Sequence, residues 1–151
     1  DDSLELIPGY GRTQGLLHRQ GDARFEGGDL RSVVERACKD QSVSMINRNR
    51  GSGTRYLIDD LLAGARPPGH SIEATSHQAV ATAIAQGRAD FGVAIDVVAQ
   101  ERALAFRPLT EERFDFMMPK GRRARPAVAA FCELLESPET REALRRGGFK
   151  P

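Results

Sequence analysis

Apolar residues recur at helical spacing in several segments of the 151-residue chain. The first clear segment follows Asp29, which can cap a helix through its side chain. One face of this helix would carry Leu30, Val33, Val34, Ala37 and Cys38. Further helices are predicted to start at the turn 51–53, at Ser76, at Asp96, at Pro126 and at Ser137-Pro138.

Short apolar runs lie between the predicted helices and predict strands at 43–47, 72–74, 90–95, 103–109 and 113–118. The glycine-rich stretch 4–22 predicts mainly loop, with a candidate strand only at Leu16-Leu17. Because strands alternate with helices, the pattern indicates an α/β fold with three layers around a mainly parallel sheet. In such sheets, ligands bind beyond the carboxyl ends of the strands, where helices begin. The turns 50–55 and 75–77 have this placement, and a third lies near Asp96.

The first of these turns combines three kinds of anion donor. Its sequence is Arg50-Gly51-Ser52-Gly53-Thr54-Arg55. The backbone N–H groups at the start of a helix are unpaired and carry a partial positive charge, which favours an anion. The two glycines allow close approach, and Ser52 and Thr54 add hydroxyl groups. Arg50 and Arg55 bracket the turn with guanidinium groups, so the segment predicts binding of a small anion. The alternative is an ordinary turn that Ser52 caps, with both arginines in solvent.

The second turn offers fewer donors. Ser76 is expected to be a helix N-cap, and His77 either contacts the anion or lies on the surface. Asp96 either caps the next helix or lies at the edge of the ligand cleft. His18 and His70 show no metal spacing with His77, so no metal and no cofactor are predicted.

Catalytic motifs are weakly represented. Ser52 and Ser76 lack the context of a nucleophile elbow, and no phosphate-loop lysine follows the glycines. One enzyme pattern fits: Arg48-x-x-Gly51-x-Gly53 matches the pyrophosphate loop of acetyl-coenzyme A-dependent N-acetyltransferases. The chain is therefore predicted not to be an enzyme, with an acetyltransferase as the alternative.

Overall charge points to no particular partner. The chain has 22 basic and 21 acidic residues, a net charge of +1, so it has no general attraction to nucleic acid or membrane. Cys38 and Cys132 form no motif and are expected to be free thiols. No apolar run is long enough to cross a bilayer. We expect a cytoplasmic location, or a periplasmic one if an upstream signal peptide has been removed.

The segment 43–119 resembles type II periplasmic-binding-protein-like domains, which occur fused to molybdopterin biosynthesis proteins or to helix-turn-helix regulators. The resemblance rests on 46–55, then on 76–81, 87–93 and 106–109. It implies a two-lobed clamshell, with about 40–96 in the second lobe and with 1–22 and 103–151 in the first lobe, which would be truncated at its N-terminus. The related molybdate- and tungstate-binding proteins imply ligand contacts at Ser52, Gly53, Thr54 and Ser76.

The resemblance also implies a role. The domain would sense or deliver molybdate, tungstate or a phosphorylated pterin, linked to molybdenum cofactor metabolism or to transcriptional regulation. Its partners would be a DNA-binding or molybdopterin-biosynthesis domain, or a second copy in a homodimer. The remaining alternative is a half-domain that binds no ligand and serves assembly.

Overall fold

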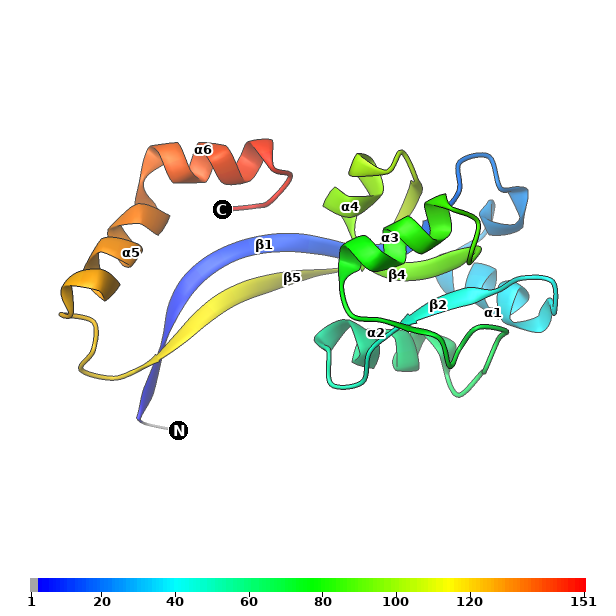
Figure 1. Cartoon of the computed structure of the whole chain (residues 1–151), viewed down its shortest axis with the longest axis horizontal. Helices are drawn as coiled ribbons and strands as arrows, with labels where there is room; N and C mark the ends of the chain where they lie inside the picture. Colours follow the sequence, from blue (N-terminus) through cyan, green and yellow to red (C-terminus); the bar gives the residue numbers. More distant parts are fainter. Residues whose placement is uncertain (1–2) are drawn as a thin grey trace. The chain divides into compact units, whose positions relative to one another are not determined.

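The computed structural model describes residues 3–151 and contains five strands, six α-helices and one short 3-10 helix (Figure 1). The strands are β1 (Leu4–His18), β2 (Met45–Arg48), β3 (Glu73–Ala74), β4 (Phe91–Ile95) and β5 (Ala105–Pro119). The helices are η1 (Ala23–Phe25), α1 (Leu30–Lys39), α2 (Gly53–Leu62), α3 (His77–Ala85), α4 (Asp96–Glu101), α5 (Pro126–Glu136) and α6 (Pro138–Arg146).

The chain forms two compact units. The inner unit is the continuous segment Thr13–Thr110, and the terminal unit combines residues up to Arg12 with Glu111–Pro151. Strands β1 and β5 each pass from one unit into the other. The segment 40–96, predicted to form the second lobe, lies within the inner unit, and its assignment to a lobe stays a prediction.

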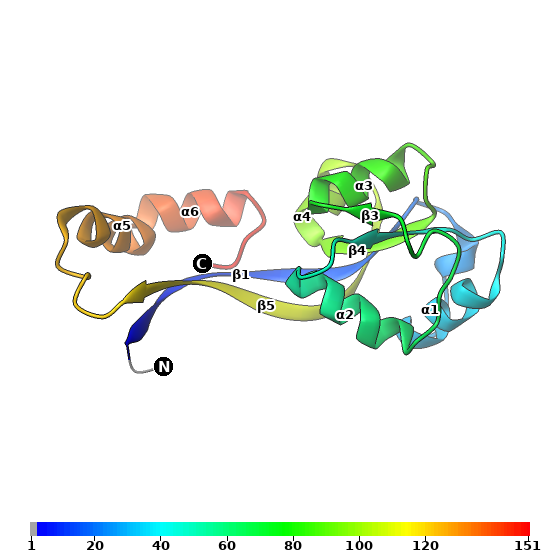
Figure 2. The ribbon, with the colours of Figure 1, turned by 60° about the horizontal axis from the view of Figure 1, so that its bottom comes forward.

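The sheet has the strand order β3-β2-β4-β1-β5. Strand β2 runs parallel to β3 and β4, and β1 pairs with β4 in the antiparallel direction. In the inner unit, α1 and α2 cover one face of the sheet and α3 and α4 cover the other (Figure 2). The predicted three-layer α/β fold is confirmed, and the antiparallel β1 makes the sheet mixed.

Side-chain caps fix the helix starts of the inner unit. Asp29 accepts a hydrogen bond from the Ser32 N–H at 3.0 Å, which begins α1 as predicted. The hydroxyl of Ser76 accepts from the Ala79 N–H at 3.1 Å and begins α3 in the same way. These bonds satisfy N–H groups that have no acceptor within the helix.

The core of the inner unit lies between the sheet and its helices. Its buried side chains are Leu16, Phe25, Val33, Val34, Ala37, Val43, Met45, Ile58, Leu61, Leu62, Phe91 and Val93. The ring centroids of Phe25 and Phe91, both in this cluster, lie 5.6 Å apart. Most of these positions belong to the apolar patterns that predicted α1, α2, β2 and β4.

A polar network joins the strand starts on the opposite side from the helix starts. Asp90 accepts hydrogen bonds from the Ser44 N–H at 2.8 Å, from Arg19 at 2.6 Å and from Arg24 at 2.8 Å. Burial alone would raise the pKa of Asp90, but these hydrogen bonds outweigh it and lower the pKa to about 2. The network connects the ends of β1 and η1 to the beginning of β2.

The terminal unit contains α5, α6 and the outer parts of β1 and β5. Pro126 is the first residue of α5, and the Ser137 hydroxyl caps α6 by accepting from the Thr140 N–H at 3.2 Å. Both helix starts are confirmed. Aromatic contacts link the strands to the helices, for example Phe116 against Phe131 at 4.9 Å between ring centroids. Neither helix has a fully buried residue.

Two strand predictions were wrong. Residues 4–18 form one strand, although the glycines there predicted loop. A side chain at Gly15 would lie 2.3 Å from the Arg107 carbonyl oxygen, and one at Gly9 would lie 1.9 Å from that of Phe114, so these glycines permit close pairing with β5. Likewise 103–109 and 113–118 belong to the single strand β5. The charged residues between them remain extended because Glu112 pairs with Arg12 of β1.

Candidate functional site

Three strand-to-helix turns of the inner unit lie at one edge of the sheet. Strands β2, β3 and β4 are parallel, and each ends where a helix begins, α2, α3 and α4 respectively. Arg48 at the end of β2 is paired in register with Ala74 at the end of β3. The predicted turns 50–55 and 75–77 are therefore neighbours, as the parallel arrangement required.

The turn before α2 is open above its glycines. Gly51 has a φ of +84°, which favours glycine, and side chains at Gly51 or Gly53 would meet no atom within 4 Å. The Ser52 hydroxyl donates to the Asn49 carbonyl oxygen at 3.0 Å and accepts from the Arg55 N–H at 3.3 Å, so it is the N-cap. Thr54 is buried and its hydroxyl belongs to the interior rather than to the open side.

The two arginines of this turn are not free, because Glu73 of β3 lies beside them. Arg55 is only 11% exposed and donates to Glu73 at 2.9 Å and to Asp59 at 2.8 Å. Hydrogen bonds to Asp59 and Glu73 raise the pKa of Arg55 above its ordinary value. Arg50 is 88% exposed, and its Nε lies 3.9 Å from Glu73. Both cations are therefore partly neutralised by an acid that is distant in sequence.

Arg48 is the residue that the sequence reasoning did not place in the anion site. Its side chain is buried, at 7% exposure, between the turn before α2 and the turn before α3. Its Nε donates to the Ala74 carbonyl oxygen at 3.3 Å, and a terminal nitrogen lies 3.1 Å from His77 Nδ1. One sequence feature could have identified Arg48: it is a charged residue at the end of an apolar strand, directly before such a turn.

The remaining predicted residues lie along the same edge. Ser76 is the N-cap of α3, as predicted, and His77 is the half-buried first residue of that helix next to Arg48. Asp96 is not the cap of α4, because it is the first helical residue and Ile95 has the cap position. Its carboxylate accepts from the adjacent Val97 N–H at 2.9 Å.

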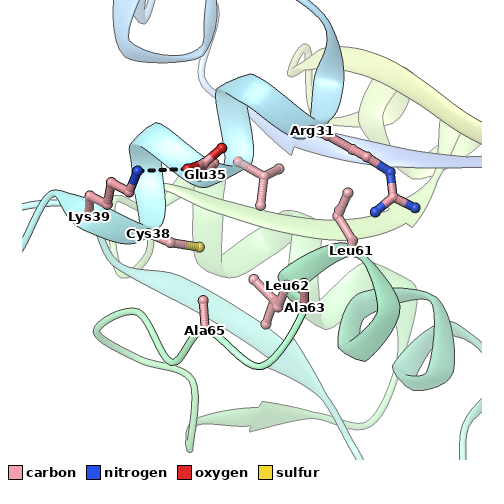
Figure 3. Close-up of a pocket in the computed structure, with 9 residues that line it drawn as sticks. Arg31, Glu35, Cys38, Lys39, Leu61, Leu62, Ala63 and Ala65 are labelled. Atoms are coloured by element: carbon pink, nitrogen blue, oxygen red, sulfur yellow. Dashed lines mark hydrogen bonds and ion pairs between the residues drawn. The ribbon is translucent and has the colours of Figure 1, made fainter.

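Another hollow lies between α1 and α2 (Figure 3). It measures about 330 Å³, with Leu61 and Leu62 on one side, Cys38 on the other and Arg31 at one end. Burial raises the pKa of the Cys38 thiol, so the free thiol stays protonated.

Neither a metal-binding cluster nor a membrane-spanning helix occurs in the part of the chain that the structure describes. Within 3–151, no three His, Cys, Asp or Glu side chains are grouped so that they could hold a metal ion. In the same range, no helix combines the length and apolar character that a membrane crossing needs.

Two sequence comparisons identify relatives. Residues 1–136 match the family described as PBP superfamily domain. The uncharacterized protein YvgK of Bacillus subtilis (strain 168) is 32% identical over 104 residues, which cover 66% of this chain and 33% of YvgK. The chain therefore matches about a third of that longer relative.

Solved structures with the same fold include binding proteins and regulators. The ancestral amino acid-binding protein that preceded cyclohexadienyl dehydratase has a TM-score of 0.65 and 15% identity, over 96% of this chain and 61% of that chain. A phosphate transport receptor from Vibrio cholerae has a TM-score of 0.61 and 12% identity, over 100% of this chain and 74% of the receptor. The regulatory domain of MetR, a LysR family regulator from N. meningitidis, has a TM-score of 0.63 and 8% identity, over 95% of this chain and 66% of that chain.

Because these sequence identities are low, the solved structures establish the fold alone. The family model, in contrast, matches most of the chain. The mixed sheet, with helices beginning at the carboxyl ends of its parallel strands, agrees with that match. The chain belongs to the family of PBP superfamily domains.

Proposed function

We propose that the inner unit binds a small anionic ligand at the sheet edge where α2 and α3 begin. The observation that carries this proposal is the buried Arg48, whose guanidinium group lies between the two helix starts and within 3.1 Å of His77. A buried cation beside unpaired helix N–H groups creates a local positive potential. Such a site favours a compact anion over a neutral ligand.

The site residues have different roles in this proposal. The N–H groups of Gly53 and Thr54, at the start of α2, would donate to the ligand across the open space above Gly51. Ser52 and Ser76 hold the two turns in place as N-caps, and their hydroxyls line the edge. His77 lies beside Arg48, and Asp96 bounds the edge with negative charge.

The ligand class follows from donor chemistry and from the relatives. A tetrahedral oxyanion such as molybdate, tungstate or phosphate can accept several N–H groups and a guanidinium group at once. The phosphate receptor from Vibrio cholerae has the same fold, which supports an oxyanion. The amino acid-binding relative makes an organic carboxylate the second ligand class to test. A phosphorylated pterin, which the resemblance of the sequence implies, is the third.

The role proposed is sensing or delivery rather than catalysis. LysR-type regulatory domains among the structural neighbours support a sensor that acts on a linked DNA-binding domain. Delivery to a molybdopterin-biosynthesis domain is the other form of the same proposal. The acetyltransferase alternative has no support from the fold, because its loop motif occurs here in a PBP superfamily domain.

A single substitution separates ligand binding from folding. Gly53 is the first residue of α2, where proline is favoured, and Ser52 before it is extended (φ −79°, ψ 144°), as the residue before a proline should be. Gly53→Pro therefore removes one N–H donor without breaking the helix. Gly53→Ala, the matched control, keeps that N–H and meets no atom within 4 Å.

The measurement is a thermal-shift titration with molybdate, tungstate, sulfate, phosphate and coenzyme A, followed by calorimetry. An oxyanion at one hundred times its dissociation constant should add about 2.7 kcal/mol of stability to the wild type. Gly53→Pro should lose about 1.5 kcal/mol or more of binding free energy, and Gly53→Ala should bind like the wild type. Equal binding by Gly53→Pro and wild type would contradict the site, and a flat response to every anion would favour the assembly half-domain.

A further inference from the structure

A second group of cationic side chains lies at the free edge of the sheet, beside β3. A hollow of about 500 Å³ is lined by Arg50, Arg55, Arg66, His70, Ser71 and Glu73. An adjoining hollow of about 270 Å³ extends along α2 and shares Arg55, Arg66 and His70. All of these residues belong to the inner unit.

Arg55 borders this hollow from the side of α2. Arg55 pairs with Asp59, one turn further along α2, and with Glu73 of β3, and it donates to the Arg48 carbonyl oxygen at 3.0 Å, so its guanidinium group lies between α2 and the ends of β2 and β3. Arg50 is directed to the same acid, Glu73. The ligand contacts proposed above for the N–H groups of α2 do not include these two side chains.

The charge in the larger hollow is unbalanced. It is lined by three arginines and by one acid, Glu73, which pairs with both Arg50 and Arg55. Among residues 3–151, Arg66 has no ion-pair partner and is exposed. Arg55 also pairs with Asp59 and donates to the Arg48 carbonyl oxygen, so the unfilled donor capacity belongs mainly to Arg50 and Arg66, because each guanidinium group carries five N–H donors.

The geometry points to a second anion site in this hollow, for a compact polyanion that carries two or more negative groups, such as a diphosphate. Its anionic groups would bind Arg50, Arg55 and Arg66 and would replace Glu73 as the partner of the first two. Ser71 would add a hydroxyl group. This site goes beyond the proposed function, since it uses other side chains and another class of ligand.

Inorganic pyrophosphate is the probe, titrated by calorimetry at constant ionic strength into the wild type, three variants of this region and its control position, and Gly53→Pro. Arg66→Ala should weaken pyrophosphate binding roughly ten-fold, the effect of one lost charge-assisted hydrogen bond. Arg88→Ala, the control, removes an exposed arginine that lines neither hollow and should leave the affinity unchanged. Glu73→Gln removes the competing carboxylate and should tighten binding several-fold, since the anion no longer has to displace a charge.

Each outcome decides between the sites. Tighter binding by Glu73→Gln together with weaker binding by Arg66→Ala supports the second site. Equal losses in Arg66→Ala and Arg88→Ala would show general charge attraction only and would overturn it, as would a lack of binding by the wild type and Glu73→Gln. A pyrophosphate affinity that falls in Gly53→Pro but not in Arg66→Ala would assign the ligand to the α2–α3 edge and would also overturn the second site. Melting curves for each variant confirm that it is folded.

Discussion

The two units differ in how far their apolar patterns become buried. The inner unit encloses a twelve-residue apolar cluster, with Phe25 and Val33 fully shielded from solvent. In the terminal unit, α5 has a comparable run of apolar residues, yet neither α5 nor α6 buries a residue fully, and Leu134 is 57% exposed. An amphipathic sequence therefore predicts a helix, but burial requires an opposing surface as well.

The largest predicted effect tests this difference in the cores. Phe91→Ala should lower the free energy of unfolding by about 3–5 kcal/mol, because Phe91 is buried against Phe25 and a cavity would remain. Phe131→Ala, in half-buried α5, should cost less than half as much. Urea denaturation followed by circular dichroism gives both values. Equal losses would mean that the terminal unit is packed as tightly as the inner unit.

An intermediate effect is expected at Asp90, which belongs to the inner unit alone. Asp90→Asn should cost about 1.5–3 kcal/mol at neutral pH, through weaker hydrogen bonds with Arg19, Arg24 and Ser44. The folded pKa of about 2 lies below the ordinary value of 3.8, so this stabilisation is complete above 3.8 and is lost as the pH falls toward 2.

Denaturation curves across that pH range provide the measurement. As the pH falls, the wild type should lose more stability than Asp90→Asn, so the free energies of unfolding of the two proteins should converge. Asp60→Asn removes one negative charge from an exposed position and controls for net charge. If wild type and Asp90→Asn remained equally far apart down to the lowest pH, ionised Asp90 would not be the source of the stabilisation.

The smallest effects concern two helix caps, one in each unit. Ser76→Ala should remove about 1 kcal/mol from the global stability of the inner unit, because it deletes the N-cap bond of α3. Ser137→Ala deletes the matching bond of α6. It should speed amide hydrogen exchange in the first turn of α6 without lowering global stability. A global loss from Ser137→Ala would show that α6 unfolds together with the main core.

Local signals in the sequence predicted helices better than strands. Asp29, Ser76 and Ser137 lie at helix starts as expected, since a cap and the bond it accepts are only three residues apart. Strand β1 was missed because its glycines serve a partner about a hundred residues away. Gly9 and Gly15 leave room for the backbone of β5, and a distant requirement of this kind has no local pattern.

The same distinction applies to the candidate site. The two turns and their neighbouring placement followed from strand–helix alternation and from the parallel sheet. The acid beside Arg50 and Arg55 could not be predicted in this way, because Glu73 reaches them from the next strand. Residue type alone did not indicate which arginine lies between the two helix starts, because Arg48, Arg50 and Arg55 lie within eight positions. The place of Arg48 at the end of the apolar strand β2 was the one signal for it.

The division into a continuous unit and a split unit has a consequence for biosynthesis. The inner unit is complete once Thr110 has left the ribosome, whereas the terminal unit needs the chain on both sides of it. Segments fold as they emerge, so the inner unit can reach its native state while the residues before Thr13 still lack strand partners that are translated later. A nascent chain stalled after β5 should thus resist protease across the inner unit before α5 and α6 exist.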